Sequence, residues 1–149
     1  MRKAIALSLQ NIARGGGPFG AVIVKDGKLV ATGVNRVTLL HDPTAHAEMV
    51  AIRRAAKKLN TFDLSGCELY SSCEPCPMCL GAIYWAHLDS LYYGNTKTDA
   101  KGIGFDDSFI YDELKLPTVS RQINTERHLP LEAIAAFETW KAKEDKVEY

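Results

Sequence analysis

The chain has 149 residues, 46% of them hydrophobic, and its 18 Lys and Arg residues balance its 18 Asp and Glu residues. This length is typical of one ordinary domain with a buried core, so we expect a single domain over residues 1–149. A formal net charge of zero, with no basic run, argues against a protein that binds a nucleic-acid backbone.

The first residues, MRKAIALSLQNIARGGG, predict a helix rather than a secretion signal. Gln10, Asn11 and Arg14 interrupt the apolar run, and no small-residue cleavage pattern follows. No stretch reaches the roughly 20 apolar residues of a membrane helix. We therefore expect a soluble, cytoplasmic protein that does not bind membranes. In such a chain the four cysteines are thiols or metal ligands rather than disulfides.

Two apolar runs, Phe19–Lys25 and Lys28–Asn35, predict antiparallel strands. The dipeptide between them, Asp26-Gly27, suits a two-residue hairpin turn. The next segment predicts a helix to about Leu59. Its start is indicated by Asp42 and Pro43, which suit a helix cap and a first helical position, and His46 then falls in the first turn. The four basic residues at positions 53, 54, 57 and 58 are expected to form a solvated helix face.

The second half alternates strand and helix. Strands are predicted over 67–72 and 88–94, with a helix between them that begins near Pro75 and Pro77. This alternation indicates a βαβ crossover. Shorter helices are predicted near 106–114 and 131–143. The expected fold is a three-layer α/β/α sandwich with a mixed sheet and helices on both of its faces.

Three cysteines at intervals of three residues, Cys73, Cys76 and Cys79, need an explanation. An iron–sulfur run would need a fourth cysteine soon afterwards, and none follows. A redox C-x-x-C pair and a structural zinc site with four protein ligands remain open on the cysteines alone. The residues His46 and Glu48 decide among these, because one imidazole and two thiolates are the three ligands of a catalytic zinc that keeps one position for water.

Both ligand groups are expected at helix N-termini, where the dipole would lower the pKa of Cys76 and of Cys79. HAE at 46–48 and PCPMC at 75–79 match H-x-E…P-C-x-x-C, the signature of zinc deaminases that act on bases. Cys73 and Cys67 fall outside this signature, and we expect both to pack as small apolar residues.

The chain resembles the cytidine deaminase-like superfamily over most of its length, and within it the bacterial guanine deaminases. The segments that carry this resemblance are GGPFGAVIVKDG at 16–27, DPTAHAE at 42–48, SSCEPCPMCLGAIYWA at 71–86 and GFDDSFIY at 104–111. His41 departs from the Asn that begins the second of these segments in the family. The resemblance implies hydrolysis of guanine to xanthine and ammonia. It also implies one zinc ion per chain, held by His46, Cys76 and Cys79, with Glu48 as the proton carrier.

The same resemblance implies substrate contacts. Asn35 would hydrogen-bond the purine, Phe19 and Trp85 would line its pocket, and Asp107 would accept from the N–H edge of the ring. The tail beyond about residue 130 ends in Tyr149, and the resemblance implies that this segment crosses to a second copy and lays Tyr149 over the partner's pocket. We therefore expect a homodimer that exchanges its C-terminal segments.

Three other functions stay open at this stage. A tRNA adenosine deaminase shares HAE and PCxxC, although the neutral charge balance and the FDDSF segment at 105–109 argue against it. A deaminase of guanosine or cytosine is a second alternative. A catalytically silent zinc module that binds a ligand is the third, and Glu48 argues against it because a purely structural site has no need of a base.

Overall fold

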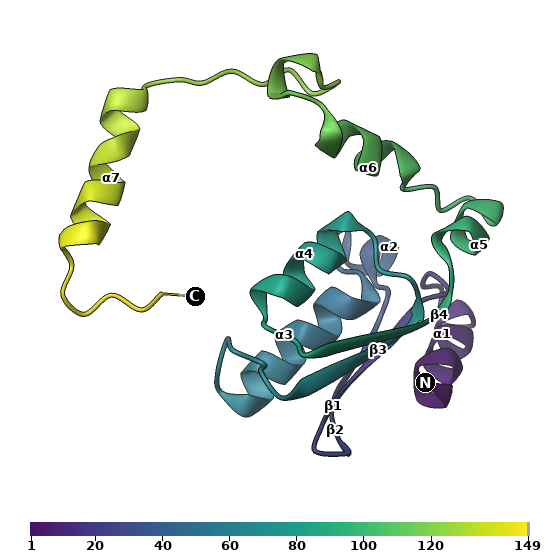
Figure 1. Cartoon of the computed structure of the whole chain (residues 1–149). Helices are drawn as coiled ribbons and strands as arrows, with labels where there is room; N and C mark the ends of the chain where they lie inside the picture. The colour runs from purple at the N-terminus through teal and green to yellow at the C-terminus, as the bar shows by residue number, and fades with distance from the viewer. Residues whose placement is uncertain (149) are drawn as a thin grey trace. The chain divides into compact units, whose positions relative to one another are not determined.

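A computed structural model describes residues 1–148 of the chain (Figure 1). It divides into two compact units, Met1–Asp107 and Ser108–Tyr149, and each is considered by itself. The first unit contains the sheet and the buried core. The expectation of one domain over the whole chain, with a C-terminal segment exchanged between copies, stays a prediction.

The sheet has four strands in the order β2-β1-β3-β4. Their bounds are β1 Gly20–Lys25, β2 Lys28–Val34, β3 Cys67–Cys73 and β4 Ser90–Asn95. The central strand β1 is antiparallel to both β2 and β3, whereas β4 is parallel to β3. This confirms the mixed sheet and the predicted crossover, because the parallel pair β3 and β4 is joined through helix α4, Pro77–Trp85.

The turn between β1 and β2 has the chemistry predicted for it. Asp26 and Gly27 have φ values of 50° and 71°, as a type I′ turn requires at both central positions.

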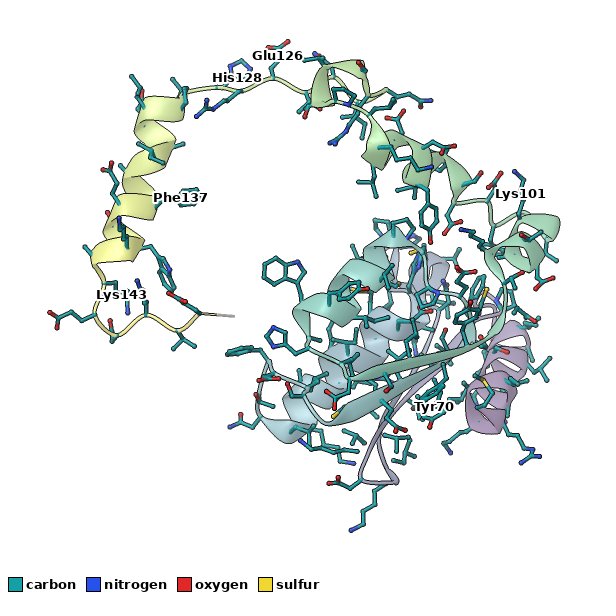
Figure 2. All side chains as sticks on the ribbon, in the orientation of Figure 1. Tyr70, Lys101, Glu126, His128, Phe137 and Lys143 are labelled. Atoms are coloured by element: carbon teal, nitrogen blue, oxygen red, sulfur yellow. The ribbon has the colours of Figure 1, made fainter. Side chains whose placement is uncertain are left out.

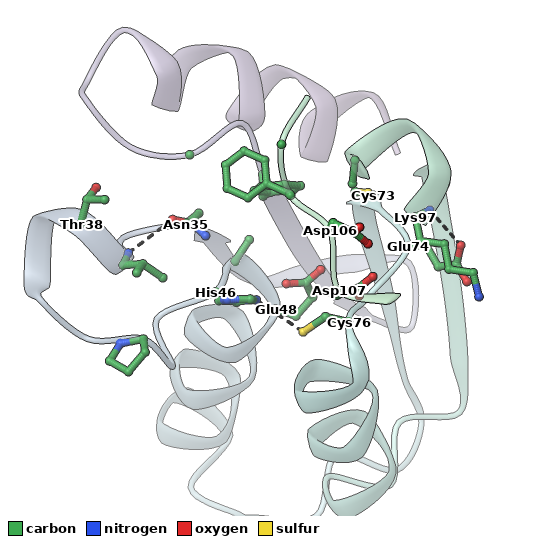
Figure 3. Close-up of a pocket in the computed structure, with 18 residues that line it drawn as sticks. Asn35, Thr38, His46, Glu48, Cys73, Glu74, Cys76, Lys97, Asp106 and Asp107 are labelled. Atoms are coloured by element: carbon green, nitrogen blue, oxygen red, sulfur yellow. Dashed lines mark hydrogen bonds between the residues drawn. The ribbon is translucent and has the colours of Figure 1, made fainter. Parts of the chain in front are cut away.

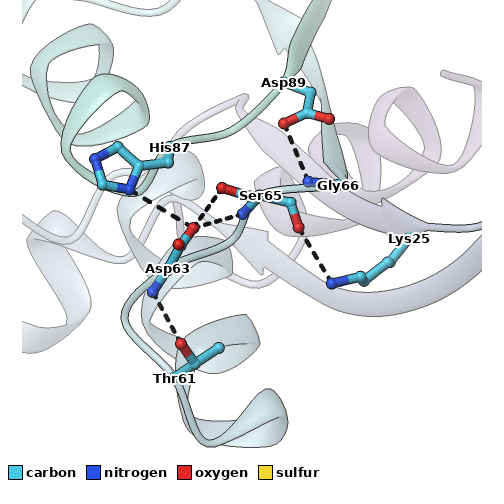
Figure 4. Close-up of polar contacts among 7 residues, drawn as sticks. All are labelled: Lys25, Thr61, Asp63, Ser65, Gly66, His87 and Asp89. Atoms are coloured by element: carbon cyan, nitrogen blue, oxygen red, sulfur yellow. Dashed lines mark hydrogen bonds and ion pairs between the residues drawn. The ribbon is translucent and has the colours of Figure 1, made fainter.

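A second connection, ahead of β3, is fixed by polar contacts (Figure 4). There Asp63 accepts hydrogen bonds from the backbone and hydroxyl of Ser65, while Asp89 accepts one from the backbone of Gly66.

Helices cover both faces of the sheet, which gives the predicted three layers (Figure 1). The helices of this unit are α1 Arg2–Ile12, α2 Val37–Leu40, α3 Ala47–Leu59, α4 Pro77–Trp85 and α5 Lys97–Gly102. Sequence reasoning identified α1, α3 and α4 but did not predict α2 or α5. Both missed helices are short, at four and six residues, so no apolar period could reveal them.

Two glycines bring the outer layers close to the sheet. A Cβ at Gly20 would lie 2.4 Å from the carbonyl oxygen of Ala4 in α1, and one at Gly33 would lie 2.0 Å from that of Ala47 in α3. Gly20 pairs with Val34, the neighbour of Gly33, so the two glycines face opposite sides of the sheet. Helix α3 therefore begins almost in van der Waals contact with the backbone of β2.

The start of α3 corrects the sequence prediction, because the N-cap is His46 and the first helical residue is Ala47, where Asp42 and Pro43 were predicted. The Asp42 carboxylate accepts hydrogen bonds from the backbone N–H and the hydroxyl of Thr44, at 2.8 and 2.7 Å, which closes a turn before the helix. His46 is consequently the N-cap residue, with an extended backbone, rather than a residue of the first turn.

The basic face of α3 is exposed, as predicted, and two of its cations also bind backbone carbonyls. Arg54 donates from Nη1 to the carbonyl of Thr32 at 3.0 Å, and Lys58 donates from Nζ to that of Val30 at 2.9 Å. The spacings agree, since four helical residues rise about 6 Å and two strand residues span about 6.7 Å. The two cations therefore bind carbonyl groups along the outer edge of β2.

The second unit contains α6 Ser108–Lys115, the short 3-10 helix η1 Thr118–Ser120 and α7 Pro130–Ala142. None of these helices contains a buried residue. Large apolar side chains such as Leu131 and Phe137 are mostly exposed, and Figure 2 shows Phe137 projecting from α7. Within residues 1–148, no helix combines the length and the apolar character needed to cross a membrane.

Candidate metal and substrate site

The candidate metal ligands stand at the N-termini of two neighbouring helices. His46 is the N-cap of α3 and Cys76 is the N-cap of α4, while Cys79 lies in the first turn of α4. Pro77 fits the first position of α4, where no backbone N–H is needed. Neither His46 nor Cys76 uses its side chain to cap its helix, so both side chains are available to a ligand.

The geometry of these three residues fits a zinc ion. Nδ1 of His46 lies 3.6 Å from Sγ of Cys76 and 3.6 Å from Sγ of Cys79, and all three ligand atoms lie within 4.8 Å of one another. Zn–S bonds of about 2.3 Å and Zn–N bonds of about 2.1 Å at a tetrahedral angle place two ligand atoms roughly 3.6 Å apart. The donor set also matches the borderline softness of zinc.

The two thiols differ in acidity. The pKa of Cys76 falls to about 4, because its sulfur accepts a hydrogen bond from Cys79 and lies beside His46. The pKa of Cys79 is raised, because its thiol donates to Cys76 and is buried near Glu48. The expectation that both values fall is thus right for Cys76 and wrong for Cys79. A divalent cation shared by both sulfurs favours the thiolate of each.

Glu48 is buried beside the sulfurs, with 5% of its surface exposed. Its Oε1 accepts a hydrogen bond from the hydroxyl of Ser71 at 2.7 Å, and its Oε2 lies 3.5 Å from Sγ of Cys79. The N-terminus of α3, with His46 as the N-cap and Glu48 in the first turn, thus presents both side chains to the same space. A carboxylate in this position can exchange protons with a group bound next to the three ligands.

A cavity of about 520 Å³ opens over this cluster (Figure 3). Its volume suits a small heterocycle. Its lining comes from the loop before β1, the segment after β2, the start of α3, the end of β3 and the residues around α5. Residues of the lining include Phe19, Asn35, His46, Glu48, Cys76 and Asp107.

Asn35 and Phe19 are brought to the cavity by the ends of β2 and β1. The Oδ1 atom of Asn35 accepts from the backbone N–H of Val37 at 3.3 Å, which leaves its Nδ2 as the donor of the amide. Asn11 of α1 donates through Nδ2 to the carbonyls of Gly17 and Asn35, at 2.8 and 2.7 Å. The buried amide of Asn11 therefore joins the segment before β1 to the segment after β2.

The adjacent carboxylates Asp106 and Asp107 have different surroundings. Asp106 forms an ion pair with Lys101 at 2.9 Å. The pKa of Asp107 is raised, first by burial and then by the nearby charge of Cys76. Both residues line the cavity, and Asp107 is the one whose charge lies close to the metal ligands.

The other two residues expected at the substrate are Trp85 and Tyr149. Trp85 is the last residue of α4 and is 65% exposed, and it does not line this cavity. Tyr149 lies outside the described residues. The roles of both in substrate binding stay predictions.

Several cavity residues were missed from the sequence. Phe105 packs edge-on against Phe19, with ring centroids 4.9 Å apart, and completes an apolar wall. Cys73 was expected only to pack as an apolar residue; it is buried, as predicted, but it also lines the cavity. Burial raises the pKa of Cys73 to about 11, so its thiol stays neutral. Other lining residues that were not predicted include Gly17, Val37, Thr38, Pro43, Glu74 and Lys97.

Residues 1–95 match a family described as the cytidine and deoxycytidylate deaminase zinc-binding region. The chain is 49% identical to guanine deaminase of Bacillus subtilis (strain 168), over all of this chain and 96% of that protein. The X-ray structure of guanine deaminase from Bacillus subtilis has a TM-score of 0.96 at 50% identity, covering 99% of this chain and 95% of that one.

Two further relatives bear on the choice of substrate. A tRNA-specific adenosine deaminase of Aquifex aeolicus is 38% identical over 89% of this chain and 84% of its own length. A protein crystallised in complex with 2,6-diaminopurine is 42% identical, with a TM-score of 0.69, over 70% of this chain and 59% of its own.

Proposed function

The chain belongs to the cytidine and deoxycytidylate deaminase family, and from this premise we propose that it hydrolyses guanine to xanthine and ammonia. The observation that carries the proposal is the 49% identity with a guanine deaminase over the whole chain. This match extends beyond the zinc-binding residues to the segment that contains Asp107 and to the C-terminal helices.

Zinc would be held by His46, Cys76 and Cys79, and when bound it supplies a water that is acidic near neutral pH. Glu48 accepts one proton from the attacking water and delivers it to a ring nitrogen as the oxygen adds to C2 of guanine. It then moves the proton of the new hydroxyl to the amino group, which leaves as ammonia. The step balances, because the water oxygen stays on C2, one water proton stays on the ring nitrogen, and the other leaves with the amino group as ammonia.

The cavity residues would orient the purine in this reaction. Asn35 donates from Nδ2 to a ring acceptor, and Asp107 accepts from an N–H of the ring. Phe19 and Phe105 supply the apolar wall against which the flat ring packs. A purine that lacks the matching N–H would leave Asp107 without a partner, which lowers its affinity.

The Aquifex relative supports one rival function, the deamination of adenosine in tRNA. Against it stands the zero formal net charge, because an RNA enzyme needs basic surface for phosphates. Ammonia release discriminates between the two when the zinc-loaded protein receives guanine, guanosine, adenine, cytosine or a tRNA anticodon stem-loop. Release from guanine at the highest kcat/KM is expected, and release from the stem-loop alone would overturn the proposal.

We also propose that the protein is a homodimer that exchanges its C-terminal segments. The support is the absence of buried residues in α6, η1 and α7, whose exposed apolar side chains need a surface to cover them. Residues Tyr84 and Trp85 on α4 are similarly exposed. Such an exchange is a low-cost route to a symmetric pair.

Mass measurement in solution and kinetics of a truncated enzyme test this assembly. Removal of residues 146–149 is expected to leave zinc content unchanged and to reduce guanine turnover, because Tyr149 is proposed to close the partner's cavity. A monomer, or a truncated form with unchanged kcat/KM, would rule out this arrangement. We propose that the reaction takes place in the cytoplasm and is a step of purine breakdown.

A further inference from the structure

The proposed function uses Glu48 but leaves open which of its two oxygens carries the proton. The two oxygens have different neighbours. Oε1 accepts the Ser71 hydroxyl at 2.7 Å, a short distance that indicates a charge-assisted hydrogen bond. Oε2 lies on the side of the sulfurs, 3.5 Å from Sγ of Cys79.

We propose that Ser71 is a positioning residue, whose hydroxyl holds Oε1 of Glu48 and thereby leaves Oε2 to exchange protons with the reacting groups. This inference rests on the proposed role of Glu48 as the proton carrier. Ser71 does not touch the substrate in this account, since it is absent from the cavity lining. It acts through Glu48.

The position of Ser71 in the fold supports this role. It lies in β3, fully buried, and its neighbours along the sheet are Ala21 of β1 and Tyr93 of β4. A hydroxyl fixed in a central strand moves little, whereas a glutamate side chain has three rotatable bonds. The rigid strand therefore fixes one oxygen of the flexible side chain, and this is not the oxygen that lies beside Cys79.

The Ser71 hydroxyl is the donor that holds Oε1 of Glu48 in place. Glu48 is 5% exposed, and Ser71 is fully buried and absent from the cavity lining, so the loss of the Ser71 hydroxyl leaves Oε1 without this donor. Without Ser71 no such hydrogen bond holds Oε1, so the carboxylate is free to rotate about the bonds of the glutamate side chain. A displacement of about 1 Å in a reacting group costs on the order of 100-fold in rate.

The next residue, Ser72, provides a matched control. It is also buried, on the same strand, but it faces the other side of the sheet, where its hydroxyl accepts from the backbone N–H of Gly20 at 3.0 Å. Replacing Ser72 with alanine removes a buried hydroxyl of the same size without touching Glu48. Any effect of the loss of a buried serine as such appears in both variants.

The test compares zinc-loaded Ser71→Ala, Ser71→Thr and Ser72→Ala with the parent enzyme. We expect Ser71→Ala to lower kcat about 10- to 100-fold with little change in KM, because the substrate contacts are intact. Ser71→Thr keeps the hydroxyl and should restore most of kcat. Ser72→Ala should lower thermal stability and keep kcat. An unchanged kcat in Ser71→Ala, or equal losses in Ser71→Ala and Ser72→Ala, would overturn the proposal.

Crystal structures of the zinc-loaded variants give a readout that does not depend on activity. The Glu48 carboxylate is expected to rotate in Ser71→Ala and to keep its orientation in Ser71→Thr and Ser72→Ala. An unrotated carboxylate in Ser71→Ala would refute the positioning role even if guanine is not the substrate. A parent enzyme that is inactive on guanine would refute the proposed function alone, since the orientation of Glu48 is measured separately.

Discussion

Replacement of Gly33 by alanine should weaken zinc binding without touching a ligand. The new Cβ would lie 2.0 Å from the carbonyl oxygen of Ala47 and 2.6 Å from the backbone nitrogen of Ala51. Normal carbon–oxygen contacts begin above 3.0 Å, so α3 must retreat from β2 by about 1 Å. Overpacking of this kind costs about 1–3 kcal/mol, and backbone atoms on both sides leave little room for relief.

The retreat moves the zinc ligand that precedes Ala47. His46 is the N-cap of α3, whereas Cys76 and Cys79 belong to α4, so a shift of α3 changes the separation between imidazole and sulfurs. Metal–ligand distances in zinc sites lie within about 0.2 Å of their standard values, so a shift of about 1 Å in one ligand disturbs the site. We expect a reduction in zinc affinity of at least 10-fold, measured by competition with a chromogenic chelator.

Gly81 supplies the control for this experiment. It lies within α4 with nothing within 4 Å of its Cβ position, so Gly81→Ala should raise stability by about 0.5–1 kcal/mol and leave zinc affinity unchanged. Parallel denaturant unfolding of the chelated proteins separates the packing cost from the metal effect. A Gly33→Ala protein with normal zinc affinity would show that contact with β2 does not set the position of His46.

Four further outcomes are expected. Glu48→Gln should keep the fold and the zinc but lose about 10²- to 10⁴-fold in turnover, since an amide cannot carry the proton, and near-normal activity would remove Glu48 from the mechanism. Asp107→Ala should reduce kcat/KM for guanine far more than Asp106→Ala in steady-state kinetics, because Asp106 is engaged by Lys101, and equal effects would place purine selection elsewhere. Metal analysis should find zinc in Cys73→Ser but not in Cys76→Ser, and the reverse result would refute the ligand assignment. After chelation, iodoacetamide should modify Cys76 down to about pH 5, because its pKa of about 4 keeps it a thiolate, whereas Cys73, with a pKa of about 11, should stay unmodified at pH 7.

The strands and the metal cluster could be predicted because their signals are local. The hairpin follows from the positive φ values that Asp26 and Gly27 accept, and the alternation of strand and helix predicts the parallel pair β3 and β4. The cluster followed from two short motifs with fixed spacing. Because each motif lies at the start of a helix, His46 and the two cysteines come together where the N-termini of α3 and α4 are neighbours.

The errors come from contacts between residues that are distant in sequence or from competition between local bonds. Asp42 has the right residue type for a helix cap, but its bonds to Thr44 close a turn instead, and the helix starts five residues later at Ala47. The contribution of Phe105 to the cavity depends on its packing with Phe19, 86 positions earlier in the chain, which no periodic pattern reveals. The hydrogen bond from Ser71 to Glu48 joins two elements in the same way.

The cations of α3 that bind the outer carbonyls of β2 make the two borders of the sheet unequal. Arg54 and Lys58 occupy acceptors that another chain would need in order to add a strand beside β2. Strand β4, at the other border, has a sheet neighbour on one side only within residues 1–107. An open polymer built by strand addition needs both borders of the sheet, and the two cations oppose such addition at β2. Strand addition at β4 therefore ends with a single pairing event, which favours finite assemblies over fibres.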